Sequence, residues 1–344
     1  MLAARYYAPR DVRLEHVDEP EAREGEVILK VLASNMCGTD LKAYQRGHPL
    51  MKPPMTMGHE YAGVISSVGS GVSRLRKGDR VVASNSAPCG VCEMCRKGSR
   101  TLCKVTAVEM VGFSIPGSHA ELLRLPRRIV STNAHKFSNS ASPAEIACAE
   151  PLAAVIHALD RVEVQRNSWA ALVGSGALGL MFLQLLKRAG AKVVMVNRSP
   201  GRLELAEKLG ADRIVQADDS SLAEKVRDVT GGIGADLVVE AAGTKETWES
   251  AFQAARNGGE VLLFGGCSAG TVVSFDAQKI HYGETTLIGS FHHEPTAFRR
   301  AVKYIENGRV KVKPLLSSTM KLEEIGMAFQ KMEQREALKI SVVP

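Results

Sequence analysis

The chain is poor in aromatic residues and has no long apolar run. Only 5% of its 344 residues are Phe, Trp or Tyr, so surfaces on which nucleic-acid bases stack are not expected. The longest apolar stretch, near 178–186, is interrupted by Gln184 and ends at Lys187, whereas a membrane-spanning helix needs about 20 apolar residues. Internal repeats, low-complexity tracts and Pro-rich linkers are also absent. These absences argue against nucleic-acid and membrane partners.

The chain shows neither a basic stripe nor a secretory leader. Its net charge is +7, but Lys and Arg are scattered among acidic residues, so we interpret the excess as solvated surface with some attraction for anionic ligands. The opening sequence MLAARYYAPRDVRLEHV has no charged stretch that leads into an apolar segment and a cleavage site. We therefore expect a cytoplasmic protein with reduced thiols.

Length and composition match a globular enzyme with two domains. The chain is 45% hydrophobic and 24% charged, as in average globular proteins, and its length exceeds one comfortable core. Between 12 and 125, short Val- and Ile-rich runs alternate with Gly, Pro, Asp and Asn, which predicts β-strands. From about 142, short apolar strands alternate with amphipathic helices. The predicted fold class is α/β, with a doubly wound parallel sheet beside a mainly β domain.

Four of the seven cysteines form one motif. Cys89, Cys92, Cys95 and Cys103 follow the spacing C-x2-C-x2-C-x7-C, in which one loop can wrap three thiolates around a tetrahedral Zn²⁺ and the fourth closes the site. A disulfide pair is disfavoured without a secretory leader. An iron–sulfur cluster is disfavoured because Lys104 replaces the Pro that usually follows the last cysteine. We predict a closed structural zinc site, which has no open position for chemistry.

A glycine-rich turn joins a predicted strand at 170–173 to a predicted helix. Its residues are Gly174, Ser175, Gly176, Ala177, Leu178 and Gly179, a G-x-G-x-x-G pattern. The first Gly permits a tight turn, the second lets the backbone approach a pyrophosphate, and the third lets the helix pack on the strand. A turn chosen only for packing is the alternative, but the surrounding βαβ series favours a dinucleotide site.

The next predicted strand ends in Asn197, Arg198 and Ser199. An NAD-binding domain usually carries an Asp or Glu here, which binds the ribose 2′-hydroxyl. Asn197 removes the carboxylate that would repel a 2′-phosphate, and Arg198 offers a bidentate cation that Ser199 and Arg202 could assist. NADP is therefore favoured over NAD. If Arg198 only stacks on the adenine, both cofactors would serve.

Cys37 and His59 lie in the β-rich half and offer one soft and one borderline metal ligand. With carboxylates, they suit an open catalytic zinc site, in which water or substrate takes the remaining position. Taken singly, each has a commoner interpretation. His59 would be a polar residue with satisfied hydrogen bonds, and Cys37 would be a buried apolar side chain.

Several motifs occur in one order along the chain. They are CGTD at 37–40, GHEYAG at 58–63, GDRV at 78–81, the four cysteines, EPL at 150–152 and the glycine turn. Together they resemble the zinc-dependent medium-chain dehydrogenase/reductase family over essentially the whole chain. The match is closest to the polyol branch of sorbitol, threonine and sugar-alcohol-phosphate dehydrogenases, where Glu-Pro-Leu replaces the third Cys ligand of simple alcohol dehydrogenases.

The resemblance implies a domain plan and an oligomeric state. A GroES-like catalytic domain would comprise 1–149 and 285–344, with the structural zinc lobe at 85–105. A Rossmann cofactor domain would comprise 150–284. Relatives commonly pair the sheet edges of their cofactor domains, so a homodimer or homotetramer is expected.

The resemblance also implies roles around the catalytic zinc. Glu150 would be the third protein ligand, directly or through water, and Glu60 would coordinate in some states or lie next to the ion. Cys148 is the competing ligand candidate. Thr39 would accept the substrate hydroxyl proton. Many relatives end this proton relay with a His at the position of Lys42, so Lys42, His48 or bulk water could complete it.

The implied reaction is hydride transfer between a secondary alcohol and C4 of a nicotinamide, with two Zn²⁺ per chain. The substrate would be a polyol, a sugar alcohol or its phosphate, and the short interval from Cys37 to His59 looks most like the galactitol-phosphate dehydrogenases. An L-threonine or simple secondary alcohol dehydrogenase, a zinc-free reductase on this scaffold and a non-enzymatic cofactor-binding protein are the alternatives. Further expected cofactor contacts are Ala242, Gly265 and Phe291. Candidate substrate contacts are His48, Lys52, His292, His293 and Arg299.

Overall fold

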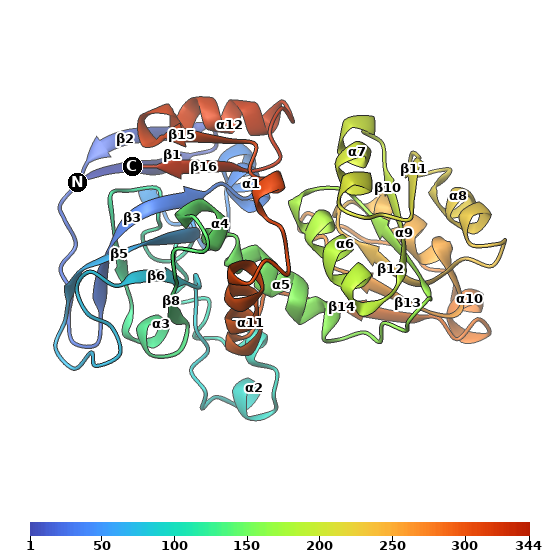
Figure 1. Ribbon diagram of the computed structural model, residues 1–344, viewed down its shortest axis with the longest axis horizontal. Coiled ribbons are helices and arrows are strands. Elements are labelled where there is room, and N and C mark those ends of the chain that lie inside the picture. Colours follow the sequence, from blue (N-terminus) through green and yellow to red (C-terminus); the bar gives the residue numbers. More distant parts are fainter. The chain divides into compact units, whose positions relative to one another are not determined.

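The computed structural model describes all residues, 1–344, and the chain forms two compact units. The first comprises Met1–Ala154 together with His293–Pro344, so both ends of the chain belong to one unit (Figure 1). The second comprises Val155–His292. The second unit is therefore inserted between the two parts of the first.

A seven-stranded sheet dominates the first unit. Its strands are β3 (Val27–Asn35), β5 (Glu60–Val68), β6 (Arg80–Ala83), β7 (Leu122–Leu125), β8 (Ala134–Lys136), β15 (Ser318–Lys321) and β16 (Ile340–Val343). The order is β15-β16-β3-β5-β6-β8, with β7 also paired to β3. Only the β15–β16 pair is parallel. The red C-terminal strand β16 thus lies beside the blue β3 (Figure 1).

A smaller sheet and short helices complete the first unit. The three strands, in the order β2-β1-β4, are β1 (Leu2–Ala8), β2 (Asp11–His16) and β4 (Met55–Thr56). The helices are α1 (Gly38–Arg46), α2 (Glu93–Arg96), α3 (Arg127–Thr132), α4 (Pro143–Ala147), α11 (Pro295–Glu306), α12 (Ile325–Glu333) and the 3₁₀ turns η1 (Arg100–Leu102), η2 (Lys313–Leu315) and η3 (Leu322–Glu324). Helix α5 (Ala149–Leu159) begins in this unit and continues into the second.

Strands β3 and β5 pack closely at the centre of the larger sheet. Leu29, Tyr61 and Ile65 on these strands are buried in one apolar cluster. A Cβ at Gly63 would collide with the carbonyl oxygen of Lys30 on β3, so the close approach of the two strands requires glycine there. The same strands carry buried polar side chains at the end where Asn35 pairs with Glu60.

The second unit is built on a parallel sheet with the order β11-β10-β9-β12-β13-β14. The strands are β9 (Trp169–Val173), β10 (Lys192–Asn197), β11 (Arg213–Gln216), β12 (Ala235–Glu240), β13 (Ala255–Leu263) and β14 (Thr286–Gly289). Taken in chain order, this arrangement is the 3-2-1-4-5-6 pattern of a dinucleotide-binding Rossmann sheet. The predicted doubly wound sheet is confirmed.

Helices connect the strands of this sheet. They are α6 (Ala177–Ala189), α7 (Pro200–Lys208), α8 (Leu222–Val229), α9 (Lys245–Ala254) and α10 (Ala277–His281). Helix α6 is buried from Gly179 to Leu186, and its C-cap is Gly190, whose left-handed backbone (φ 90°) favours glycine. Helix α9 begins at Thr244, whose side chain accepts the N–H of Thr247.

The parallel sheet extends further along the chain than the sequence analysis expected. Strand β14 pairs in parallel with β13, although it follows residue 284, where the expected cofactor domain ended. The second unit ends only at His292. Four residues of modest apolarity give little periodicity, and the partner strand is what identifies them as a strand. No helix has both the length and the apolarity needed to cross a membrane.

Candidate active site

A cluster of side chains that could hold a metal ion lies where α1 and β5 begin. Cys37 is the N-cap residue of α1, and His59 directly precedes β5. One ligand atom each from Cys37, His59 and Glu60 lies within 4.8 Å of the others. Thr39 stands in the first turn of α1, with its hydroxyl oxygen 3.7 Å from the Cys37 sulfur. The thiolate, imidazole and carboxylate form a donor set that suits zinc.

A buried carboxylate orients the imidazole of this cluster. Asp40 on α1 is fully buried, and its Oδ1 lies 3.1 Å from Nδ1 of His59. Its other oxygen accepts the backbone N–H of Cys37 at 2.8 Å. Burial alone would raise the pKa of Asp40, but His59, His119 and the Cys37 N–H hold it below its usual value. An Nδ1–H donated to Asp40 leaves Nε2 of His59 as the metal-binding atom.

A second buried histidine lies beside Asp40. His119 is fully buried, and its Nε2 lies 4.0 Å from Oδ2 of Asp40. Its Nδ1 lies 2.8 Å from the hydroxyl of Ser34, which is 2.6 Å from the hydroxyl of Ser118. Burial lowers the pKa of His119 to about 4. The ring therefore stays neutral beside the negative Asp40 at physiological pH.

Glu60 is held by a buried ion pair. The ammonium of Lys339, directly before β16, lies 2.7 and 2.5 Å from the two carboxylate oxygens of Glu60 and 3.3 Å from the Met36 carbonyl oxygen. Both charged side chains are buried. Burial alone would lower the pKa of Lys339, but Glu60 and Cys37 raise it, so the ammonium remains charged.

Glu150 contributes another carboxylate near the same place. Burial is the main cause that raises the pKa of Glu60 to about 7, and the negative charge of Glu150 adds to it. Glu150 is itself buried, with Oε1 3.4 Å from Nε2 of His293. Two buried carboxylates that repel one another need positive charge nearby. Lys339 supplies one such charge, and a divalent cation bound at Cys37 and His59 would supply more.

Four further residues were predicted as relay or substrate contacts. His48 and His59 each lie 4.9 Å, centroid to centroid, from the ring of Phe113, so His48 is close to the site. Lys42, Lys52 and Arg299 are exposed.

Cys148, the competing ligand candidate, lies inside the protein with its sulfur hydrogen-bonded. It is fully buried, and Asn35 donates to its sulfur at 3.3 Å. Burial raises its pKa to about 12. Its sulfur is engaged with Asn35 and does not belong to the cluster of Cys37, His59 and Glu60.

The four-cysteine loop has the dimensions of a zinc–thiolate site. The sulfur atoms of Cys89 and Cys95 are 4.0 Å apart, and those of Cys92 and Cys103 are 3.8 Å apart. A tetrahedral site with Zn–S bonds of about 2.3 Å places its sulfur atoms about 3.8 Å apart. Backbone N–H groups of Val91 and Cys92 lower the pKa of Cys89, which favours the thiolate, whereas burial raises the pKa of Cys95 to about 12. The spacing and the donors therefore fit zinc.

The glycine turn between β9 and α6 has the geometry of a dinucleotide loop. Gly174 has a left-handed backbone (φ 103°), and a Cβ at Gly179 would collide with the Gly174 carbonyl oxygen. Gly176 is the N-cap of α6, and a Cβ there would meet no other atom, so its backbone faces open space. Ala177 and Leu178 form the first turn of α6, whose N-terminus can receive a phosphate. Ser175 accepts a 2.6 Å hydrogen bond from the Asn197 side chain.

Arg198 and Ser199 follow β10 and are both exposed. Ser199 is the N-cap of α7, and its side chain makes no capping hydrogen bond. Arg202 lies on α7 and is partly exposed. The end of β10 thus presents a guanidinium and a hydroxyl, with no carboxylate at Asn197.

Glu240, which the sequence analysis did not identify, organises the neighbouring loops. One carboxylate oxygen accepts the N–H groups of Ala242 at 2.8 Å and Gly243 at 2.7 Å, while the Glu240 carbonyl oxygen accepts the N–H of Gly265 at 2.9 Å. Glu240 ends β12 and pairs with Val173, which ends β9. Ala242 and Gly265 therefore lie at the same end of the strands as the glycine turn. Phe291, predicted to line the nicotinamide pocket, is 63% exposed.

Three residues near the metal cluster were also missed by the sequence analysis as functional positions. Asp40 is part of the CGTD motif, and its place three residues after Cys37 is a capping-box spacing that could have identified it. His119 and Lys339 lie far from the cluster in sequence, and no spacing or periodicity connects them to it. Their roles become visible only through tertiary contacts.

We predict that Lys339→Met lowers the free energy of unfolding by about 3–5 kcal/mol, because it leaves the Glu60 carboxylate buried without its counter-charge. Lys339→Arg should retain most of the stability. Lys30→Met is the matched control, since Lys30 is exposed on β3. Urea unfolding of the three variants measures the effect. Equal stability of Lys339→Met and Lys30→Met would contradict the prediction.

Comparison with known proteins identifies the family. The profile of the alcohol dehydrogenase GroES-like domain matches residues 23–134, and that of the zinc-binding dehydrogenases matches residues 177–307. A sorbitol dehydrogenase of Bacillus subtilis (strain 168) is 30% identical over 350 residues, which cover 100% of this chain and 97% of that protein. D-arabinitol dehydrogenase 1 of Uromyces fabae is 31% identical over 348 residues, with 100% and 97% covered.

A solved structure agrees in fold over the same length. A zinc-binding dehydrogenase of Sinorhizobium meliloti 1021, bound to NADP, superposes with a TM-score of 0.91 at 29% identity and covers 100% of this chain and 99% of that one. The predicted family and fold class are confirmed. The chain belongs to the zinc-binding dehydrogenases with a GroES-like domain, in the polyol branch that includes the sorbitol and arabinitol dehydrogenases.

Proposed function

We propose that this protein oxidises a secondary hydroxyl of a polyol, a sugar alcohol or its phosphate, with two zinc ions per chain and NADP as the favoured cofactor. The observation that carries the proposal is the cluster of Cys37, His59 and Glu60, whose ligand atoms lie within 4.8 Å of one another, with the buried carboxylate of Glu150 close to Glu60. The first unit would be the GroES-like catalytic domain. The second would be the Rossmann cofactor domain.

Cys37, His59 and Glu150 would hold the catalytic zinc. Glu60 would remain beside the ion, because Lys339 already contacts both of its carboxylate oxygens. Zinc with an open coordination position lowers the pKa of an alcohol and polarises a carbonyl.

Asp40 would keep the His59 ring in the orientation that presents Nε2. Thr39, whose hydroxyl is close to the Cys37 sulfur, would accept the substrate hydroxyl proton and pass it outward. Lys42 is exposed on α1, so bulk water or His48 is the better candidate for the next step of the relay.

The second zinc ion would be structural. Cys89, Cys92, Cys95 and Cys103 supply four thiolates and leave no position for substrate. Its role would be to hold the loop that contains α2 in one conformation. All seven cysteines are free of disulfides, which fits the reducing environment of the cytoplasm.

The preference for NADP rests on the residues that follow β10. Asn197 is engaged with Ser175 and carries no charge, so nothing at this position repels a 2′-phosphate. Arg198 can bind the phosphate in a bidentate manner. Ser199 stands at the N-terminus of α7, where the helix dipole favours an anion.

We also propose that the protein is a homodimer or homotetramer. Strand β14 forms one edge of the six-stranded sheet, and an edge strand offers unpaired backbone groups to a second strand. Two β14 strands could pair in this way.

The main test combines metal analysis with a substrate panel. The purified protein should contain two zinc ions per chain and should oxidise polyols or polyol phosphates faster than threonine or simple secondary alcohols. A chelator should abolish turnover, and added Zn²⁺ should restore it, because alcohol activation requires the metal. Full turnover of a chelated protein with one zinc ion would contradict the proposal. The ratio of kcat/KM for a polyol and its phosphate identifies the form of the substrate.

Arg198→Ala should lower kcat/KM with NADP by about 10- to 100-fold, because a charge-assisted hydrogen bond to phosphate is lost. The value with NAD should change less than about twofold. Arg213→Ala is the matched control, since Arg213 is exposed at the start of β11. Steady-state kinetics with both cofactors measure the effect. Parallel losses with NADP and NAD would show that Arg198 does not recognise the 2′-phosphate.

Thr39→Val should lower kcat by about 100-fold or more, the usual contribution of a positioned proton acceptor. Thr39→Ser keeps the hydroxyl and should retain most of the activity. Zinc content should be equal in both variants, which separates the relay from metal binding. Full kcat of Thr39→Val across the pH range would remove Thr39 from the relay.

A further inference from the structure

A cavity of about 730 Å³ lies in the second unit. It is at the end of the parallel strands opposite the end that carries the glycine turn. It is lined by the end of α8, the end of α9, the start of β13 and α10, which contribute Arg227, Gln253, Arg256 and Lys279 among others. Strand β12 spans six residues, and at about 3.3 Å per residue the two ends are roughly 17 Å apart. A ligand here would be separate from a dinucleotide bound at the glycine turn.

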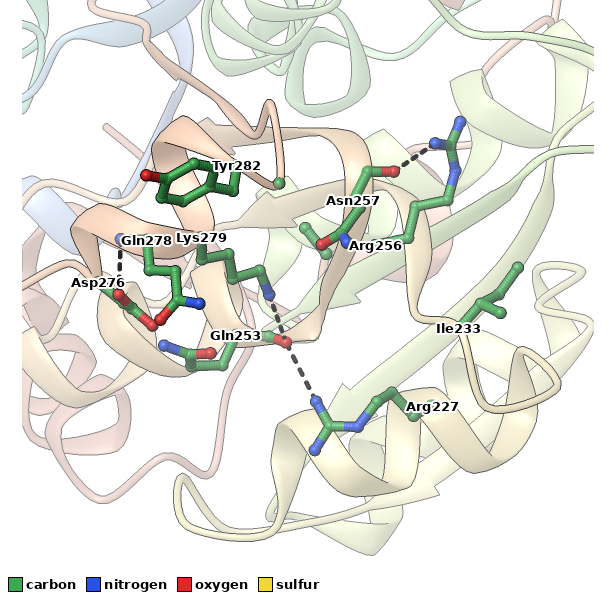
Figure 2. A pocket seen from close by; sticks show the side chains of 11 residues that line it. Arg227, Ile233, Gln253, Arg256, Asn257, Asp276, Gln278, Lys279 and Tyr282 are labelled. Atoms are coloured by element: carbon green, nitrogen blue, oxygen red, sulfur yellow. Dashed lines mark hydrogen bonds between the residues drawn. The ribbon is translucent and has the colours of Figure 1, made fainter.

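Two cations converge on one neutral atom in this cavity. Lys279 Nζ donates to the carbonyl oxygen of Gln253 at 2.9 Å, and a guanidinium nitrogen of Arg227 donates to the same oxygen at 3.2 Å (Figure 2). No carboxylate stands between them. Both side chains are partly buried, so their repulsion is only partly screened by water.

The other charged residues of the cavity do not neutralise the positive charge of Lys279 and Arg227. Arg256 is paired with Asp236 at 2.7 Å. Asp276 is the one acidic lining residue, and its Oδ1 accepts the N–H of Gln278 at the start of α10. Burial and the charge of Arg227 lower the pKa of Lys279 to about 8, whereas Asp276 opposes that shift only in part.

We propose that this cavity binds a phosphorylated small molecule, through Lys279 and Arg227. A phosphate would supply the negative charge that the two cations lack, and guanidinium and ammonium groups both bind phosphate strongly. The volume of the cavity, about 730 Å³, falls within the range of small-molecule sites. Side-chain amides of Asn257 and Gln278 and the exposed ring of Tyr282 offer polar and stacking contacts for the rest of the ligand.

The test measures binding by calorimetry to the whole protein saturated with dinucleotide cofactor, so that the glycine turn is already occupied. The probes are inorganic phosphate, adenosine monophosphate and a sugar phosphate, with adenosine and the free sugar as uncharged controls. At least one phosphate probe should bind with one site per chain, and neither uncharged control should bind. The probe that binds most tightly shows whether the ligand is free phosphate, a nucleotide or a sugar phosphate.

Variants locate the site. Lys279→Gln and Arg227→Gln should each weaken binding by about tenfold, the loss expected for one charge-assisted hydrogen bond, and Lys279→Arg should retain it. Lys208→Gln, at the exposed end of α7 and outside the cavity, should bind as the parent does. Thermal unfolding confirms that each variant folds.

Three results would overturn the proposal. The first is the absence of saturable binding, including the case in which a second copy of the chain covers the cavity. The second is binding that survives both Gln substitutions, since the ligand would then lie elsewhere. The third is weak binding that sulfate reproduces equally well, which would mark an adventitious ion only. None of these results depends on catalytic activity, so the proposed function is tested separately.

Discussion

The buried ion pair between Glu60 and Lys339 connects the C-terminal strand to the cluster of Cys37, His59 and Glu60. Lys339 precedes β16, Glu60 begins β5, and the Lys339 ammonium also contacts the carbonyl oxygen of Met36, next to Cys37. Three chain segments therefore meet at one ammonium group. A buried charge without a partner costs several kcal/mol. These segments must consequently stay together for the carboxylate to remain ionised, and their contact fixes where the donor atoms of the cluster lie.

Burial at this end of β3 and β5 makes the site rigid. Asp40, His59 and His119 are all withdrawn from water. Asp40 is hydrogen-bonded to His59 and His119 to Ser34, whereas Nε2 of His119 lies 4.0 Å from Asp40 without a hydrogen bond. In a low-dielectric setting, moving one member of either hydrogen-bonded pair would leave the other member without its partner. A metal ligand oriented in this way loses little entropy on binding. The donor atoms are thus held in place before a metal ion binds.

The sequence predicted the parts of the protein whose signals are local. The cysteine spacing and the turn at Gly174 predicted sites whose sulfur distances and backbone angles fit the expected ligands, because each lies within a few residues of chain. The contacts of Lys339 and His119 were not predictable, since long-range packing places these residues at the cluster and no periodicity records it. The place of the strand at 286–289 in the parallel sheet was not predicted for the same reason, because the partner strand is what assigns so short a strand to a sheet.

The two ends of the strands in the parallel sheet differ in the backbone groups that the neighbouring helices leave without partners. At the end with the glycine turn, the helix N-terminus offers N–H groups and a positive dipole, which an anionic cofactor satisfies. At the other end, helices terminate, and carbonyl groups of their last turns need donors. Lys279 and Arg227 satisfy the Gln253 carbonyl oxygen at the end of α9. A carbonyl oxygen satisfies hydrogen bonds but carries no full charge, so the same contacts that complete the helix concentrate positive charge in a cavity. Anion affinity at this end of the strands would then be a consequence of capping the helix with cations.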